Sequence, residues 1–234
     1  MPVTGRTSAL SRGTTAEEVA SVLRELIMDG SLTPGEQLRE EALSEQFDVS
    51  RRTVRDALGA LARERIVRHY RHKGSRVVLF SEDDIRDLYR VRRTLEGSAA
   101  RRAKRLTDQQ LQELRDAFAD LEAATRSGSA DDVVRRDLAF HQAVVGLNGS
   151  ARVDEFFAGI AVEMRYALSI LESTYRESDR RPEEALDEHR EILTAFLERN
   201  ATKAGRLVEE HALANEELLV GAVDSLDVTG LSAQ

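Results

Sequence analysis

Apolar side chains recur every three or four residues along most of the chain, which is the spacing of amphipathic helices. From Ser81 onward the pattern is entirely helical, and two short polar segments, 127–129 and 148–150, and Pro182 interrupt it. Ser81 and Thr107 each suit the cap that opens a helix. The predicted helices span residues 81–105, 107–126, 130–147, 150–176, 182–199 and 202–223. Six helices with short connections predict an all-α antiparallel bundle.

The N-terminal third predicts three shorter helices and then a hairpin. The helices begin after Thr15 and end near Gly30, run from Glu40 to Phe47, and run from Val49 to Leu61. Two β-prone runs, 66–71 and 76–80, flank Lys73-Gly74-Ser75 and predict a small hairpin. We therefore expect a mainly α protein: an N-terminal winged helix-turn-helix of three helices plus a small β-hairpin, followed by the bundle of about six helices.

The helix predicted over Val49–Leu61 carries an unusual charge pattern. Ser50 suits its N-cap, and an apolar stripe follows its length. Arg51, Arg52 and Arg55 fall in the first turn and a half, where the helix dipole disfavours positive charge. This placement indicates a negative partner supplied from outside, and the second helix of a helix-turn-helix meets DNA with its N-terminal residues. An ordinary amphipathic helix with a solvated basic face would explain the same residues.

Composition narrows the class of protein. The 234 residues include no cysteine, which excludes disulfides and thiolate metal sites. No apolar run approaches the ~18 residues that span a membrane, and the N-terminus lacks a signal-peptide core, so we expect a cytoplasmic protein with no membrane partner. The net charge is −8, yet residues 49–78 hold nine Lys/Arg against two Asp/Glu. A basic patch before an acidic domain is typical of a DNA-binding regulator.

Three of the five histidines lie in the acidic part of the chain, on three different predicted helices: His141, His189 and His211. Asp137 precedes His141 by four residues, so both side chains project from one helical face. A carboxylate and imidazoles from several helices are how a bundle core builds a metal site. Three unrelated histidines, each hydrogen-bonded in the core or at the surface, are the simpler alternative.

The N-terminal segment resembles the GntR family of bacterial transcription regulators. The matching residues are, in order, Leu32–Leu38, Glu40, Leu43–Glu45, Val49–Leu58, Leu61 and Gly74. The resemblance implies that Arg51 and Arg55 reach base edges or nearby phosphates, and that Arg52 and Thr53 tune the choice of base. The family usually has a Thr-Pro pair where this chain has Arg52-Thr53, and some members carry a basic residue in place of Glu41. The operator sequence therefore cannot be taken from relatives.

The same resemblance implies that His72, Lys73 and Gly74 form the tip of a wing that enters the minor groove or contacts phosphate. Ser50, at the start of the reading helix, completes the candidate DNA contacts. Two-fold dimers that read pseudo-palindromic half-sites are the usual arrangement for such domains. We therefore expect a homodimer on double-stranded DNA.

The C-terminal part resembles the FCD domain of the FadR-type GntR regulators. The matching segments are Val91–Glu96, Asp137–His141, Glu188–Ile192 and His211. The resemblance implies that one divalent ion is held by Asp137, His141, His189 and His211. Zinc is the first expectation, and nickel, manganese and iron are alternatives that ligand softness does not separate.

Four protein ligands leave room on a five- or six-coordinate ion for a small carboxylate. Arg92 or Arg93 would clamp that carboxylate, and Asn148 would assist. Simpler roles exist for two of these residues, a salt bridge from Arg92 to Glu96 and a helix stop at Asn148.

We therefore predict a sequence-specific transcription regulator, more often a repressor, whose operator affinity is controlled by an organic acid bound at the metal. The predicted segments are a disordered tail (1–13), the DNA-binding domain (14–80), an effector-binding and dimerisation domain (81–224) and a flexible tail (225–234). The alternatives are the same regulator with a purely structural metal, a nucleoid-binding protein, and a metalloenzyme fused to a DNA-binding module. No motif marks an additional acid or base beside the four ligands, so we expect no catalytic residue.

Overall fold

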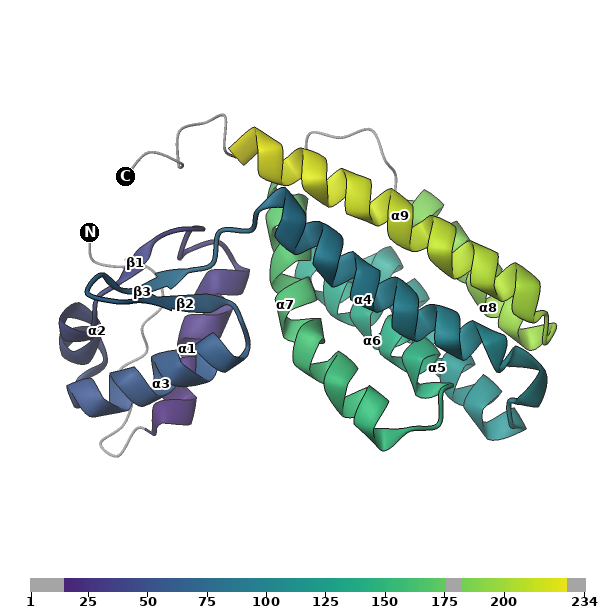
Figure 1. Ribbon diagram of the computed structural model, residues 1–234, viewed down its shortest axis with the longest axis horizontal. Helices are drawn as coiled ribbons and strands as arrows, with labels where there is room; N and C mark the ends of the chain where they lie inside the picture. The colour runs from purple at the N-terminus through teal and green to yellow at the C-terminus, as the bar shows by residue number, and fades with distance from the viewer. Residues whose placement is uncertain (1–14, 176–181, 227–234) are drawn as a thin grey trace. The chain divides into compact units, whose positions relative to one another are not determined.

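The computed structural model describes residues 15–175 and 182–226, and it divides the chain between Leu79 and Phe80 into two compact units. Figure 1 shows the helices and strands of the two units. The tail predicted over 1–13 lies outside the described residues, as does 227–234 of the second predicted tail.

The N-terminal unit contains three helices and three short strands. The helices are α1 (Ala16–Met28), α2 (Glu40–Phe47) and α3 (Arg51–Arg63), and the strands are β1 (Gln37–Leu38), β2 (Val67–Tyr70) and β3 (Gly74–Val77). The predicted hairpin is present as the antiparallel pair of β2 and β3, with Val67 opposite Val77 and Tyr70 opposite Gly74. The three-helix-plus-hairpin architecture predicted for this part of the chain is confirmed.

The sequence analysis missed strand β1. Gln37 and Leu38 pair antiparallel with Arg76 and Ser75, which gives the sheet the order β1-β3-β2. Two residues are too few to display the alternation that identifies a strand, and β1 forms only because the edge of β3 offers it backbone hydrogen bonds.

The helices of this unit begin and end where local chemistry dictates. The Ser50 hydroxyl accepts a hydrogen bond from the Thr53 amide and so caps α3. Asp48 takes a left-handed conformation, φ 53°, and reverses the chain between α2 and α3. Leu58 and Leu61 of α3 are buried, and α1 and α2 both pack on α3. This packing therefore fixes the position and tilt of α3, and with them the placement of its first turn at the surface.

The C-terminal unit is an all-α bundle, as predicted. Its helices are α4 (Glu82–Arg101), α5 (Asp108–Ser127), α6 (Ala130–Gly146), α7 (Ala151–Tyr175), α8 (Pro182–Leu197) and α9 (Ala201–Leu226). The first of them was expected to reach residue 105, but α4 ends at Arg101 and a 3₁₀ turn follows over Ala103–Arg105. This tighter turn lets the chain bury Ala103 and Leu106 before α5 begins.

Helices α4 and α9 lie side by side and run in opposite directions (Figure 1). Helix α6 packs on α4, α5 and α7, and α8 packs on α5 and α9. Phe118, Phe140 and Phe196 form part of the shared core, each at most 8% exposed. Within the described parts of the chain, no helix has the length and apolar character needed to cross a membrane.

Candidate functional site

Three helices of the C-terminal unit bring four predicted ligands together. Asp137 and His141 come from α6, His189 from α8 and His211 from α9. Each residue offers one ligand atom, and these four atoms all lie within 4.8 Å of one another. We call these residues the four-residue cluster. Its three histidines are buried, at 0%, 3% and 5% exposure.

Distances within the four-residue cluster show which atoms converge. The Nε2 atoms of His141 and His189 are 3.1 Å apart, and Oδ1 of Asp137 lies 2.8 Å from His189 Nε2 and 3.8 Å from His141 Nε2. The ring centroids of His189 and His211 are 4.5 Å apart. Nitrogen and oxygen ligand atoms from four side chains therefore lie close enough together to bind one metal ion.

Behind each histidine, an acceptor faces the other ring nitrogen. His189 Nδ1 lies 2.6 Å from the Ala185 carbonyl oxygen, and His211 Nδ1 lies 2.8 Å from Oε2 of Glu188. His141 Nδ1 lies 3.1 Å from Oε1 of Glu96, although that pair does not meet hydrogen-bond geometry. A protonated Nδ1 leaves the Nε2 lone pair free to bind a metal, and such partners are a regular feature of metal-binding histidines.

Burial and neighbouring charge set the protonation states. Burial lowers the pKa of His141, helped by the positive charge of Arg92. Burial, with His189 nearby, lowers the pKa of His211 to about 3. Burial alone would raise the pKa of Asp137, but His141 and His189 outweigh it and lower that pKa. The lowered pKa values favour neutral His141 and His211 and an ionised Asp137 carboxylate, which are the forms of these side chains that bind a divalent metal.

A divalent metal ion fits this donor set. Three imidazoles and one carboxylate suit zinc, nickel, manganese or iron, and neither the donor atoms nor their spacing selects one of them. The same residues are poorly explained as unrelated core histidines, because three imidazole rings and a carboxylate share one buried space.

Arg92 joins this cluster from α4. Its side chain is 1% exposed, Nε donates to Oε1 of Glu96 at 2.8 Å, and Nη2 contacts Nε2 of His141. The salt bridge to Glu96 that we considered as its simpler role is present. Burial would raise the pKa of Glu96, but His141 and Arg92 lower it to about 2, so the pair is ionised. Arg92 therefore combines a fixed salt bridge with donors that face the cluster.

The other two candidate effector residues direct their donors elsewhere. Arg93 Nη1 donates to Oε2 of Glu216 on α9. Asn148 Nδ2 donates to the carbonyl oxygens of Leu95 and Val145, at 3.1 and 2.9 Å, which is the helix-stop role. Arg93 follows Arg92 directly, and consecutive helix positions point about 100° apart, so both cannot face the cluster.

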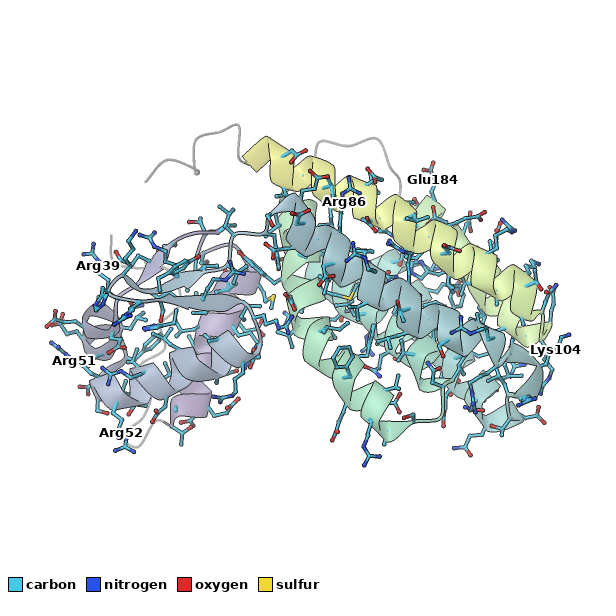
Figure 2. All side chains as sticks on the ribbon, viewed as in Figure 1. Arg39, Arg51, Arg52, Arg86, Lys104 and Glu184 are labelled. Carbon is cyan, nitrogen blue, oxygen red and sulfur yellow. The ribbon has the colours of Figure 1, made fainter. Side chains whose placement is uncertain are left out.

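In the N-terminal unit, the candidate DNA contacts lie on the surface at the start of α3. Arg51, Arg52 and Arg55 are exposed, and Thr53 is half-buried. Figure 2 shows Arg39, Arg51 and Arg52 projecting from the same end of this unit. Arg39 stands directly before α2 and is a further cation that the sequence analysis missed. Its place directly before the predicted helix start at Glu40 is the sequence feature that could have identified it.

Two of the three arginines of α3 have partners within the protein. Arg55 makes a two-point contact with Glu40 of α2, at 3.1 and 2.7 Å, and Arg51 pairs with Glu41. Hydrogen bonding from Arg55 lowers the pKa of Glu40. Arg52 lies 3.9 Å from Asp56 and its side chain is 91% exposed. The expected external partner is thus partly replaced by two internal glutamates, which the sequence analysis did not foresee.

The wing tip has the shape of a tight turn. His72 and Gly74 both have positive φ, 61° and 79°, and His72, Lys73 and Gly74 are exposed. Gln37 of β1 donates a side-chain hydrogen bond to the carbonyl oxygen of Lys73 at 3.0 Å. This hydrogen bond therefore holds the turn to β1, while the side chains of residues 72 and 73 face solvent.

Two protein-family models match the chain. The model of bacterial regulatory proteins of the gntR family covers residues 15–77, and the FCD domain model covers residues 87–214.

Among the curated relatives, the gluconate operon transcriptional repressor of Bacillus licheniformis is 27% identical over 93% of this chain and 95% of its own length. The D-xylose utilization operon repressor of Paenarthrobacter nicotinovorans is 25% identical, over 88% of both chains. A solved GntR transcriptional regulator from Rhodococcus sp. RHA1 has a TM-score of 0.72 and 28% identity, over 88% of this chain and 97% of its own. These relatives are regulators of transcription rather than enzymes.

Proposed function

Since the chain belongs to the GntR family of DNA-binding transcriptional regulators and carries an FCD domain, we propose that a divalent metal and a small carboxylate bound in that domain control its operator affinity. We assign it to the FadR-type branch on the FCD match. The DNA-binding domain would span residues 14–80 and the effector domain 81–224. The metal ligands would be Asp137, His141, His189 and His211.

One observation carries the proposal: the ligand atoms of four side chains meet within 4.8 Å in a buried space. Glu188 and the Ala185 carbonyl support two of the histidines from behind. Bound there, the ion would supply a Lewis-acidic centre that an anionic effector could coordinate.

Arg92 is the effector-binding residue that the geometry supports. The Nε2 atom of His141 has one lone pair, so it cannot both accept from Arg92 and bind a metal. A metal ion on that atom would free Arg92 Nη2 to donate to a carboxylate on the ion, while Nε stays on Glu96. Charge-assisted hydrogen bonds of this kind are stronger than neutral ones. Arg93 and Asn148 are left out of this site because their donors are engaged elsewhere.

On the DNA side, we propose that Arg51, Arg52, Thr53 and Arg55 read bases or contact phosphates, with Ser50 as the cap that positions them. His72, Lys73 and Gly74 would contact the minor groove or its phosphates. We also propose a cytoplasmic homodimer on a pseudo-palindromic operator. Both curated relatives described above are named repressors, which supports that role here.

The decisive experiment measures metal content and operator affinity together. Purified full-length protein is analysed by elemental mass spectrometry, and His189→Ala is compared with His69→Ala, a wing histidine outside the four-residue cluster. We expect His189→Ala to lose metal and His69→Ala to keep it. Operator affinity is then measured with metal, with chelator, and with metal plus short carboxylates. An affinity that responds to none of these would make the metal purely structural.

A further inference from the structure

Tyr89 lies one helical turn before Arg92 on the buried face of α4. Its side chain is 0% exposed, and the Arg92 guanidinium carbon lies 5.4 Å from the centroid of its ring. Tyr89, Arg92 and Glu96 are spaced three and four residues apart, so α4 presents all three on one face. Two of them already adjoin the four-residue cluster.

The hydroxyl of Tyr89 is buried and has no hydrogen-bond partner among the residues that the structure describes. Buried tyrosine hydroxyls usually find a partner, because an unpaired polar group in the core destabilises the fold. Phenylalanine would fill the same space without that penalty. Arg92 beside it can only donate to the hydroxyl oxygen, so the hydroxyl hydrogen lacks an acceptor, which a ligand from outside the chain would supply.

Charged groups of the proposed site act on the Tyr89 hydroxyl. Burial raises the pKa of Tyr89 to about 12, Arg92 opposes this, and Asp137 and Glu96 add to it. Asp137 is a member of the four-residue cluster, and Arg92 and Glu96 contact another member, His141. Tyr89 therefore adjoins the four-residue cluster through Arg92, whose guanidinium lies over the Tyr89 ring and contacts His141.

We propose that Tyr89 is an effector-binding residue whose hydroxyl donates a hydrogen bond to the carboxylate that the metal and Arg92 also hold. This role rests on the proposed function, since it requires the same carboxylate. Two carboxylate oxygens offer about four lone-pair sites, enough for a metal ion, a guanidinium donor and one hydroxyl. A carboxylate satisfies all three groups, whereas an ester or an amide lacks the negative charge that the metal and Arg92 favour.

The test is Tyr89→Phe, which removes only the hydroxyl. Zinc-loaded full-length wild type and Tyr89→Phe are titrated by calorimetry with acetate, glycolate and succinate. For whichever probe the wild type binds, we expect about 10- to 100-fold weaker binding by Tyr89→Phe, the range for a hydrogen bond to a charged group. Zinc content, measured by elemental mass spectrometry, should be the same in both proteins.

Tyr166→Phe is the matched control. Tyr166 of α7 is also buried, at 1% exposure, and burial raises its pKa. Its substitution should leave carboxylate affinity unchanged. A second readout is thermal unfolding without carboxylate, in which Tyr89→Phe should melt no lower than wild type because it loses an unpaired group.

The outcomes separate this role from the proposed function. Equal carboxylate affinities of wild type and Tyr89→Phe would overturn the role of Tyr89 and leave the metal and Arg92 in place. Failure of zinc-loaded wild type to bind any of the three acids would overturn both. Loss of zinc from Tyr89→Phe, or a lower melting temperature without carboxylate, would make Tyr89 a structural residue.

Discussion

At the scale of single residues, the hydrogen-bond acceptor that faces Nδ1 of each histidine in the four-residue cluster determines which ring nitrogen can bind a metal. Glu188 and the Ala185 carbonyl each accept from an Nδ1 atom, so the lone pairs of His211 and His189 are directed to the Nε2 side. Glu188 precedes His189 in the sequence but serves His211 on the next helix. Two consecutive residues of α8 thus provide one candidate ligand, His189, and the hydrogen-bond acceptor of a second candidate ligand, His211.

Removing that support should weaken the metal without deleting a ligand. We expect Glu188→Gln to lower zinc affinity by about 10- to 100-fold, the usual effect of changing an outer-sphere partner of a metal-bound histidine. Competition with a zinc chelator measures the change. Glu191→Gln is the control, since Glu191 is an exposed neighbour on the same helix. Equal zinc affinities for the two variants would mean that Glu188 does not support the centre.

Some residues of the candidate site could be predicted from the sequence, and others could not. The spacing of Asp137 and His141 predicts a shared helical face, and the family resemblance adds His189 and His211. Neither identifies Tyr89 or Glu188. In the sequence of an amphipathic helix, a single tyrosine looks like any core residue, and a single glutamate looks like any surface residue. Their partners come from other helices, and that arrangement emerges only when the bundle packs.

At the scale of elements, α2 and α3 work as a pair. Glu40 and Glu41 at the start of α2 neutralise Arg55 and Arg51 at the start of α3. In the proposed complex, DNA would therefore compete with internal carboxylates for Arg51 and Arg55, two of the three arginines. Such exposed pairs are weak, about 0–1 kcal/mol, so phosphates or guanine edges can displace them.

Arg55 should matter for sequence preference. We expect Arg55→Ala to reduce affinity for the operator by about 10- to 100-fold, since a good bidentate base contact is worth ~1–3 kcal/mol, and to leave zinc content unchanged. Arg63→Ala, at the other end of α3, is the control for loss of positive charge. Fluorescence anisotropy with operator and scrambled DNA measures both. An equal loss in the two variants would reduce Arg55 to a general electrostatic role.

Glu41 should act in the opposite direction. It carries negative charge beside the arginines proposed to contact DNA, and its side chain is 66% exposed. We expect Glu41→Gln to bind DNA about threefold more tightly at low salt, with the gain shared by operator and scrambled sequences. Glu45→Gln, elsewhere on α2, should have a smaller effect. If Glu41→Gln instead weakens binding to the operator alone, Glu41 itself takes part in reading the sequence.

The elements show why most of the fold is predictable. Helix starts at Thr15, Ser50, Ser81 and Thr107 use local capping chemistry, which a sequence displays directly. Strand β1 depends on a partner 39 positions later, Arg76 opposite Gln37, and carries no local mark. Local chemistry was therefore sufficient for the helices and insufficient for the sheet edge.

At the scale of the whole molecule, the candidate metal ligands and the candidate DNA contacts lie in different units. All four candidate metal ligands lie between residues 137 and 211, and all the candidate DNA contacts lie between 50 and 74. The uneven charge of the chain follows the same division, because the basic stretch 49–78 belongs to the N-terminal unit. A net charge of −8 is therefore compatible with DNA binding, since the positive charge is concentrated in the N-terminal unit that carries the candidate DNA contacts.

This division predicts how metal affects stability. Metal that binds only the folded C-terminal unit stabilises that unit, by ~4 kcal/mol at a free concentration 1,000 times Kd. Differential scanning calorimetry with and without chelator should show two transitions, of which zinc raises only one. Limited proteolysis assigns the shifted transition to residues 80–226. A single transition that zinc shifts as a whole would mean that the two units unfold together.

The pairing of β1 with β3 also bears on the order in which the N-terminal unit forms. Besides the strand register, the Gly35 amide donates to the Val77 carbonyl at 3.1 Å, and Arg76 donates to the Gly35 carbonyl at 2.9 Å. The two helices of the helix-turn-helix lie in the chain segment that these contacts close. Such long-range closures form late in folding, because their entropy cost precedes their reward. During synthesis, these contacts can close around α2 and α3 only after residue 77 has left the ribosome, so the two helices emerge before the sheet edge that joins the ends of their segment.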